Sequence, residues 1–205
     1  MARPREFDTD QALAQIADTF WTKGYEATSL GDLEQATGLA RPRLYAAFGA
    51  KRDMLHKSID WYLNGPLERV FSQVDNSGID GITNWFTMIA GLRKAEPEKA
   101  TKGCLVVNSL VELANTDVGV SERGQAYRAR LLAAFRSALE TSDACGDIDG
   151  RIEERSNIAL MLLLGMFVSI KGGNSADAVA DLAESAISVV ESWRVAPTKT
   201  PTASP

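Results

Sequence analysis

The 205-residue sequence predicts an all-α protein. Almost every informative segment repeats its apolar residues with helical period, no stretch alternates cleanly with period two, and turn-forming residues fall between helix-length blocks. Apolar residues make up 45% and charged residues 24% of the chain, which is typical of a packed globular protein. We expect a three-helix N-terminal domain over 1–50, a helical domain over 51–195 and a disordered tail over 196–205.

The first helix is expected over about residues 9–23. Asp8 or Thr9 can cap its start, because the side-chain oxygen accepts backbone hydrogen bonds, and Gly24 ends it. Apolar residues at spacings of three and four give this helix one buried face, which consists of Leu13, Ile16, Ala17 and Phe20.

Two short helices joined by a tight turn are expected next. Ser29, followed three residues later by Asp32, resembles a capping box at the start of the first one. Gly38 supplies the turn and Leu39 begins the second short helix. Pro42 falls in its first turn, where a missing N–H costs little.

The remaining helices form a larger C-terminal domain. The segment 152–171 is apolar on nearly all sides, so we expect it at the centre or at an interface. The segment 175–194 has the cleanest amphipathic pattern, and 142–150 is expected to be a loop. Earlier helices are expected over 51–74 with a bend at Gly65-Pro66, 79–95, 104–114 and 121–139.

Positive charge is concentrated in one short stretch. The net charge of −5 excludes a protein that is basic overall. Residues 1–60 carry eight Lys and Arg against nine Asp and Glu, whereas 41–57 carry five Lys and Arg against one Asp. Any binding of nucleic acid must therefore rest on the local patch 41–57.

The segment 28–51 has the pattern of a helix-turn-helix. Two short helices joined by a glycine turn place the second helix in the major groove of DNA. Arginine at the start of that helix suits paired hydrogen bonds with guanine, and nearby lysine or hydroxyl groups suit phosphate. A plain helical hairpin with a solvated basic edge is the alternative. The expected DNA-contacting residues are Thr28, Ser29, Gly38, Arg41, Pro42, Arg43, Tyr45 and Lys51.

The run TSLGDLEQATGLARPRLYAAFGAK, preceded by FWTKGYEAT, resembles the N-terminal domain of TetR/AcrR-type transcriptional regulators. The resemblance covers about residues 7–60, where Gly, Leu-Tyr, Phe and Lys fall at matching offsets. It implies a homodimer that binds a palindromic double-stranded operator, most often as a repressor. It also implies an inducer cavity in the C-terminal helices and a dimer interface through 152–171 and 175–194, although ordinary internal packing is the alternative for these two helices.

The chain departs from the family pattern at several positions. Ala40 and Ala50 stand where a serine often caps a helix, which weakens the expected start of the recognition helix and of the helix after it. Pro42 replaces a small residue, and Ala46-Ala47 removes an aromatic or histidine contact. Neither the operator sequence nor the choice between repression and activation follows from the chain.

Large side chains of the C-terminal helices are candidates for the lining of an inducer cavity. Core packing is the alternative for each of them, because aromatic and methionine residues at helical spacing more often belong to the core. The candidates are Trp61, Trp85, Phe86, Met88, Met161, Met166 and Phe167.

Cys104 lies in the run TKGCLVVNSLVEL, near an expected helix N-terminus and close to Lys102. Both features lower the pKa of a thiol. The segments KGCLVV and LGMFVSIK are similar to a branch of the family with electrophile- and oxidant-sensing repressors, in which a lysine at the position of Lys171 assists the cysteine. A small buried packing residue is the alternative for Cys104, and Cys145 is expected to be incidental.

The sequence does not favour an enzyme. His56, the single histidine, is expected to face solvent or phosphate, and no residue pattern has metal-ligand spacing or forms a phosphate-binding glycine loop. We therefore expect no catalytic residue, cofactor or metal. The chain lacks a signal peptide pattern and a bilayer-length apolar run, so a cytoplasmic protein is expected. A helical ligand-binding protein whose DNA-binding head has lost its function is the remaining alternative.

Overall fold

The computed structural model describes residues 7–95, 101–141 and 150–194. Every regular element in these residues is a helix, which confirms the predicted fold class. None of the helices described is long and apolar enough to cross a membrane. The predicted tail over 196–205 and Cys145 lie outside the described residues.

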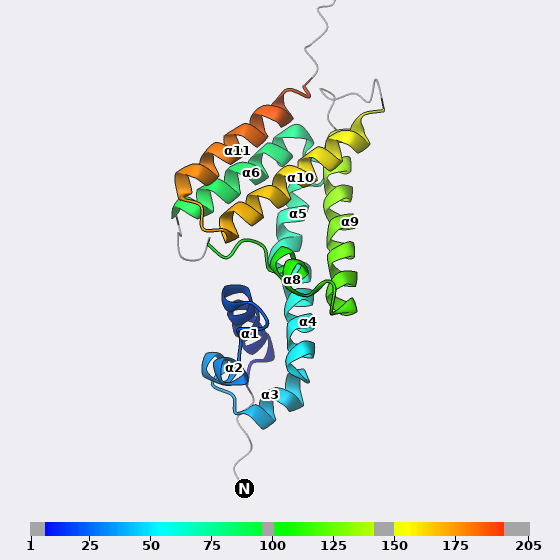
Figure 1. The fold of residues 1–205 in the computed structure, drawn as a ribbon. Helices are drawn as coiled ribbons and strands as arrows, with labels where there is room; N and C mark the ends of the chain where they lie inside the picture. The colour runs from blue at the N-terminus through cyan, green and yellow to red at the C-terminus, as the bar shows by residue number, and fades with distance from the viewer. Residues whose placement is uncertain (1–6, 96–100, 142–149, 195–205) are drawn as a thin grey trace, which may run out of the picture.

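Three short helices gather at one end of the molecule (Figure 1). They are α1 (Thr9–Lys23), α2 (Leu30–Thr37) and α3 (Arg41–Phe48). The third begins two residues later than the sequence predicts. The three helices enclose a small core of buried side chains that includes Ile16, Phe20, Leu33, Leu44 and Phe48.

Local capping sets the starts of α1 and α2 as predicted. The carboxylate of Asp8 accepts backbone hydrogen bonds in the first turn of α1. Ser29 and Asp32 form a full capping box, because each side chain accepts a hydrogen bond from the other residue's backbone N–H, at 3.1 and 2.8 Å. Gly38 ends α2 at φ 68° and ψ 9°, a left-handed conformation that favours glycine and turns the chain into α3.

A long helix, interrupted by a π-helical turn, joins the two parts of the molecule (Figure 1). It consists of α4 (Lys51–Tyr62), a π-helical turn (Leu63–Leu67) and α5 (Glu68–Val74). The widened turn contains Pro66, which lacks the N–H that an α-helical turn needs. The α-helical pattern is therefore interrupted at the position where the sequence predicts a bend, and α4 packs along α1 on its way into the C-terminal part.

The C-terminal part is a bundle of helices that differ in length. They are α6 (Gly78–Ala95), α8 (Leu105–Leu113), α9 (Val118–Glu140), α10 (Ile152–Lys171) and α11 (Ala176–Glu191). α6 packs along α11 and α9 packs along α10, while the short α8 lies between this bundle and the N-terminal helices (Figure 1). Each predicted helix is present, with ends that differ by a few residues.

Candidate DNA-reading helix and adjoining cavity

The eight-residue α3 has one buried and one exposed side. Leu44 and Phe48 are buried on the side of α3 that packs against α2 and α4, whereas Arg41, Arg43 and Tyr45 are exposed. Pro42 lies in the first turn of α3 and is also exposed. A helix whose polar residues all lie on the open side can enter a groove about 12 Å wide.

Glu34 supplies the helix cap that the sequence lacks at Ala40. Ala40 has no side-chain acceptor, but one carboxylate oxygen of Glu34 accepts a hydrogen bond from the backbone N–H of Arg41 at 2.7 Å. The other oxygen lies 3.2 Å from the guanidinium of Arg41. The expected weakening of this helix start is therefore offset by a residue from α2, which also fixes the position of Arg41.

Aromatic rings support two further cations at this surface. The ammonium nitrogen of Lys51 lies 4.3 Å from the centre of the Tyr25 ring, and the guanidinium of Arg43 lies 5.1 Å from that of Phe7. The missing cap at Ala50 is compensated in part, because the carboxylate of Asp53 accepts a hydrogen bond from its N–H at 2.8 Å.

Two expectations about this region are wrong. Thr28 was expected to reach phosphate, but its side chain is buried and its hydroxyl donates to the carbonyl oxygen of Gly24 at 2.6 Å. His56 was expected to face solvent or phosphate, but its Nε2 lies 3.0 Å from the carboxylate of Asp117, the cap of α9. Arg52 contacts the same carboxylate at 3.1 Å, so this cluster joins α4 to α9.

Five polar contacts between described residues tie α1 and the turn after it to the C-terminal part. On α1, the indole N–H of Trp21 donates to the carbonyl oxygen of Gly103 at 3.1 Å, and Asp18 pairs with Lys102 at 2.5 Å. The ammonium of Lys171 lies 3.4 Å from the carbonyl oxygen of Trp21. The carboxylate of Glu112 accepts backbone hydrogen bonds from the turn after α1. Sequence reasoning missed these contacts, because partners that are 82 to 150 residues apart leave no local pattern.

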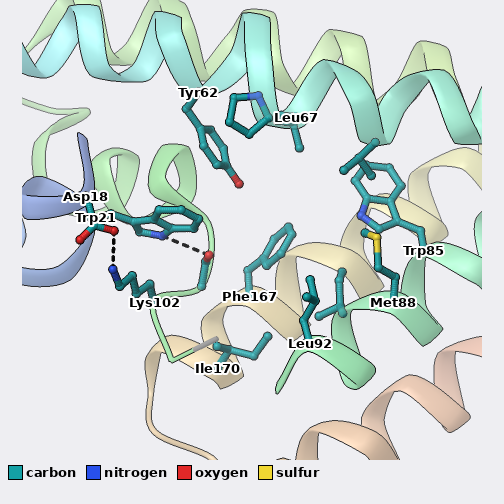
Figure 2. A pocket seen from close by; sticks show the side chains of 14 residues that line it. Asp18, Trp21, Tyr62, Leu67, Trp85, Met88, Leu92, Lys102, Phe167 and Ile170 are labelled. Carbon is teal, nitrogen blue, oxygen red and sulfur yellow. Dashed lines mark hydrogen bonds and ion pairs between the residues drawn. The ribbon is translucent and has the colours of Figure 1, made fainter. Parts of the chain in front are cut away.

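A cavity of about 350 Å³ lies at the junction of the two parts. Figure 2 shows that α1 contributes Asp18 and Trp21 to its wall, so the N-terminal helices themselves form one side of it. Apolar and aromatic side chains dominate the rest of the lining, which suits a small molecule. Those labelled in Figure 2 are Tyr62, Leu67, Trp85, Met88, Leu92, Phe167 and Ile170.

The cavity contains some but not all of the expected lining residues. Trp85, Met88 and Phe167 lie on its wall. The other candidates do not line this cavity, and their part in ligand binding stays a prediction. Trp61 is half-buried and packs against the core, Phe86 and Met166 are core side chains, and Met161 is exposed on α10.

Cys104 follows Lys102 and Gly103, which line the cavity, and its own side chain is fully buried. Its thiol donates to the hydroxyl of Tyr127 at 3.6 Å, and the hydroxyl of Tyr62 points to its sulfur at 3.9 Å. Desolvation by burial raises the pKa of the Cys104 thiol and outweighs these hydrogen bonds and those of the α8 N-terminus, which lower it. The expected lowering of this pKa is therefore wrong, although Cys104 does occupy the predicted place at the start of α8.

An exposed basic helix suited to the major groove and a cavity suited to a small molecule occur together in helix-turn-helix transcriptional regulators. Residues 12–57 match the family model described as bacterial regulatory proteins of the tetR family. The chain is 32% identical to the HTH-type transcriptional regulator YezE of Bacillus subtilis (strain 168) over 165 residues, which is 79% of this chain and 84% of YezE. The chain therefore belongs to the tetR family of bacterial regulatory proteins, which are regulators and not enzymes.

Two further relatives extend this similarity. The chain is 27% identical to the HTH-type transcriptional repressor ComR of Escherichia coli (strain K12) over 186 residues, which is 88% of each chain. Its fold matches a cysteine-substituted variant of the TetR family regulator CifR, solved in complex with 26-bp double-strand operator DNA. That match has a TM-score of 0.77 and 28% identity and covers 91% of this chain and 98% of CifR.

Proposed function

We propose that this TetR-family regulator is a repressor that binds a palindromic operator as a homodimer and is released by a small molecule bound in the cavity. The observation that carries the proposal is the exposed basic side of α3 in helix-turn-helix geometry. The similarity to the repressor ComR and to CifR, which was solved on operator DNA, supports it. A repressor of chromosomal genes acts in the cytoplasm, where the promoter DNA of a bacterium lies.

The proposed DNA contacts divide into two groups. Arg41 and Arg43 read base edges from the first turn of α3, with Pro42 setting the path of the chain between them. Ser29, Tyr45 and Lys51 contact phosphate, and Gly38 allows the turn that presents α3. Thr28 is left out of this set, because its hydroxyl is buried and bound to Gly24.

The proposed dimer forms through 152–171 and 175–194, the segments that contain α10 and α11. Both helices expose apolar side chains although their opposite sides are buried in the core. On α10, Met161 is 63% and Val168 is 56% exposed, and on α11 Leu182 and Val189 are each 39% exposed. A twofold interface uses the same surface on both subunits, so these side chains can cover one another.

DNA binding is tested by fluorescence anisotropy with fragments from upstream of the gene, titrated with salt. Binding through several phosphates should weaken steeply as salt rises. We expect Arg43→Ala to lose about 1–3 kcal/mol with loss of sequence preference, and Lys51→Ala to weaken all sequences equally. Arg69→Ala on α5 is the matched control, because this exposed arginine lies outside the helix-turn-helix. If no upstream fragment binds at low salt, the chain is instead a helical ligand-binding protein.

A second and narrower proposal is that Cys104, assisted by Lys171, senses electrophiles. Its position favours the idea, because the hydroxyl of Tyr62 donates to the sulfur of Cys104 and Tyr62 also forms part of the cavity wall. The raised pKa keeps the thiol protonated, and the thiol is fully buried. An electrophile in the cavity therefore reaches the sulfur only after the side chain of Tyr62 moves aside. An alkene electrophile such as N-ethylmaleimide would then form an S–C bond, and the thiol proton would end on the neighbouring carbon.

The sensing proposal is tested by release of DNA from the wild-type protein and from Cys104→Ser. We expect N-ethylmaleimide to release the wild-type protein only, and Lys171→Met to slow that release. Cys145 remains in both proteins and serves as the internal control for unspecific alkylation. Equal release of wild type and Cys104→Ser would rule out Cys104 as the sensor and leave reversible binding in the cavity as the route of induction.

A further inference from the structure

We propose that the cavity binds an amphiphilic carboxylate whose anionic group takes the place of Asp18 on Lys102. The ligand is a small monocarboxylic acid with an apolar body, and its binding breaks a tie between α1 and the segment before α8. This inference rests on the proposed function, because it specifies the chemistry of the inducer and the first contact that the inducer changes.

The polar end of the cavity is built around one ammonium group. Lys102 lies in the cavity wall, its side chain is only 15% exposed, and its nitrogen is 2.5 Å from a carboxylate oxygen of Asp18. The side chain of Asp18 is 64% exposed, so solvent already competes for it. The ammonium of Lys171 donates to the carbonyl oxygen of Trp21 and is not part of the cavity wall. This end therefore holds one ammonium whose partner carboxylate is mostly exposed, so that the anionic group of a ligand can compete with Asp18 for Lys102.

The opposite end of the cavity is apolar. Figure 2 shows Trp85 and Met88 at this end, Phe167 and Tyr62 between the two ends, and Lys102 with Asp18 at the other. Among the residues that the structure describes, Asp18 and Lys102 are the only charged side chains of the lining. A ligand with one charged end and an apolar body fits this division, because its head and its tail each meet groups of matching polarity.

The size of the cavity limits the ligand further. A volume of about 350 Å³ is at the lower end of the range for small-molecule sites. The cavity therefore suits a single aromatic ring with a short chain, or a medium-length alkyl chain, and excludes large polycyclic compounds.

Replacement of Asp18 couples the ligand to the DNA-binding helices. Asp18 is on α1, which packs against α2 and α4 in the helix-turn-helix unit. When the ligand carboxylate occupies Lys102, α1 keeps its contact between Trp21 and Gly103 but loses the ion pair beside it. A ligand shifts a conformational equilibrium only by the difference between its affinities for the two conformations. In this proposal the ion pair of Asp18 and Lys102 is present only in the conformation without the ligand.

The ligand class is tested by calorimetry of the full chain with matched pairs of acids and alcohols. The pairs are octanoate with octanol, decanoate with decanol, and 4-phenylbutyrate with 4-phenylbutanol. We expect one or more acids to bind at least about tenfold more tightly than the matched alcohol, as for a charge-assisted hydrogen bond. Lys102→Met should remove this preference, so that each acid binds no more tightly than its matched alcohol. If no acid in the series binds more tightly than its alcohol, the proposal is wrong.

Asp18→Asn provides a second variant with the opposite expected effect. It removes the competing carboxylate and keeps the ammonium, so acids should bind about two- to fivefold more tightly. Because Asp18 is exposed, this variant is expected to fold even if Lys102→Met does not. Unchanged or weaker binding of acids to Asp18→Asn would contradict the exchange.

Addition of the best-bound acid to the protein–DNA complex separates the two proposals. Release of DNA that depends on Lys102 supports both the inducer role of the cavity and the anion site at Lys102. Acid binding that depends on Lys102 without release of DNA supports the ligand class and contradicts the inducer role. Release of DNA by the alcohols as effectively as by the acids supports the inducer role and contradicts the anion site.

Discussion

Glu112 on α8 accepts a hydrogen bond from the backbone N–H of Tyr25 at 2.9 Å, and its second oxygen accepts one from Glu26 at 2.8 Å. These two residues form the turn between α1 and α2, so a helix of the C-terminal part holds the start of the DNA-reading unit. Gly24 makes the close approach possible, because a Cβ atom there would lie 3.1 Å from the Glu112 carboxylate at a φ of 86°. The two parts of the molecule are thus joined by Glu112 at this turn, as well as by Asp18 and Lys102 in the cavity wall.

Glu112→Ala is expected to lower the free energy of unfolding by about 1 kcal/mol, since two charge-assisted hydrogen bonds are lost at an exposed site. Glu112→Gln should lose less, because its amide oxygen still accepts one of them. Urea denaturation of both variants measures the difference. Equal stability of Glu112→Ala and the wild type would show that the carboxylate does not support the turn.

Glu34→Ala is expected to destabilise the protein by about 1 kcal/mol, as for other lost helix caps. The reason is that Glu34 provides the acceptor for the first turn of α3 in place of a cap at Ala40. Ala40→Ser in the same background should restore stability, because the extended backbone at this position suits a capping serine. Thermal denaturation of the single and double variants tests this, and a double variant no more stable than Glu34→Ala would contradict it.

The Asp117 cluster predicts a defined loss of stability in acid. Desolvation raises the pKa of Asp117, but hydrogen bonds from the Val120 N–H and His56 and the charge of Arg52 outweigh it, so the pKa is lowered overall. A lowered folded-state pKa contributes stability above the unfolded value of about 3.9 and loses it as the pH falls through the folded value.

Asp117→Asn should therefore be less stable than the wild type at pH 7, by about 1–3 kcal/mol for a buried charged acceptor. The difference should shrink below about pH 4, where the wild-type carboxyl becomes protonated. Urea denaturation at several pH values measures the two curves. A difference that stays constant from pH 7 to pH 3 would show that the charge of Asp117 is not the stabilising element.

The proposed dimer interface predicts that charged substitutions on the exposed side of α10 convert the dimer into a monomer. The double variant Met161→Glu and Val168→Glu should be monomeric in analytical ultracentrifugation at concentrations where the wild type is dimeric. Four like charges would then be buried in one twofold interface, which is strongly unfavourable. Val111→Glu is the matched control, because Val111 is an exposed apolar residue on α8. Dimerisation of the double variant would place the interface elsewhere.

Features that depend on neighbours along the chain follow from the order of the amino acids. Helical period gave the all-α class, the Ser29–Asp32 spacing gave the start of α2, and Gly38 gave the turn before α3. The interruption of the α-helix at Gly65-Pro66 follows from the missing N–H of proline. These features are local, because helix periodicity, caps and turns involve residues a few positions apart.

Contacts between side chains that are far apart in the sequence depend on how the helices pack in three dimensions. Sequence periodicity marks Trp61 and Trp85 equally as large helical residues, yet only Trp85 lies on the cavity wall. The chain position of Cys104 next to Lys102 indicated a lowered thiol pKa, but desolvation by burial raises this pKa and outweighs the hydrogen bonds of Tyr62 and Tyr127, which lower it. The ties of Asp18 to Lys102 and of Glu112 to the turn before α2 bring together residues more than 80 positions apart. Packing of distant helices sets such contacts, and packing is what a one-dimensional pattern does not contain.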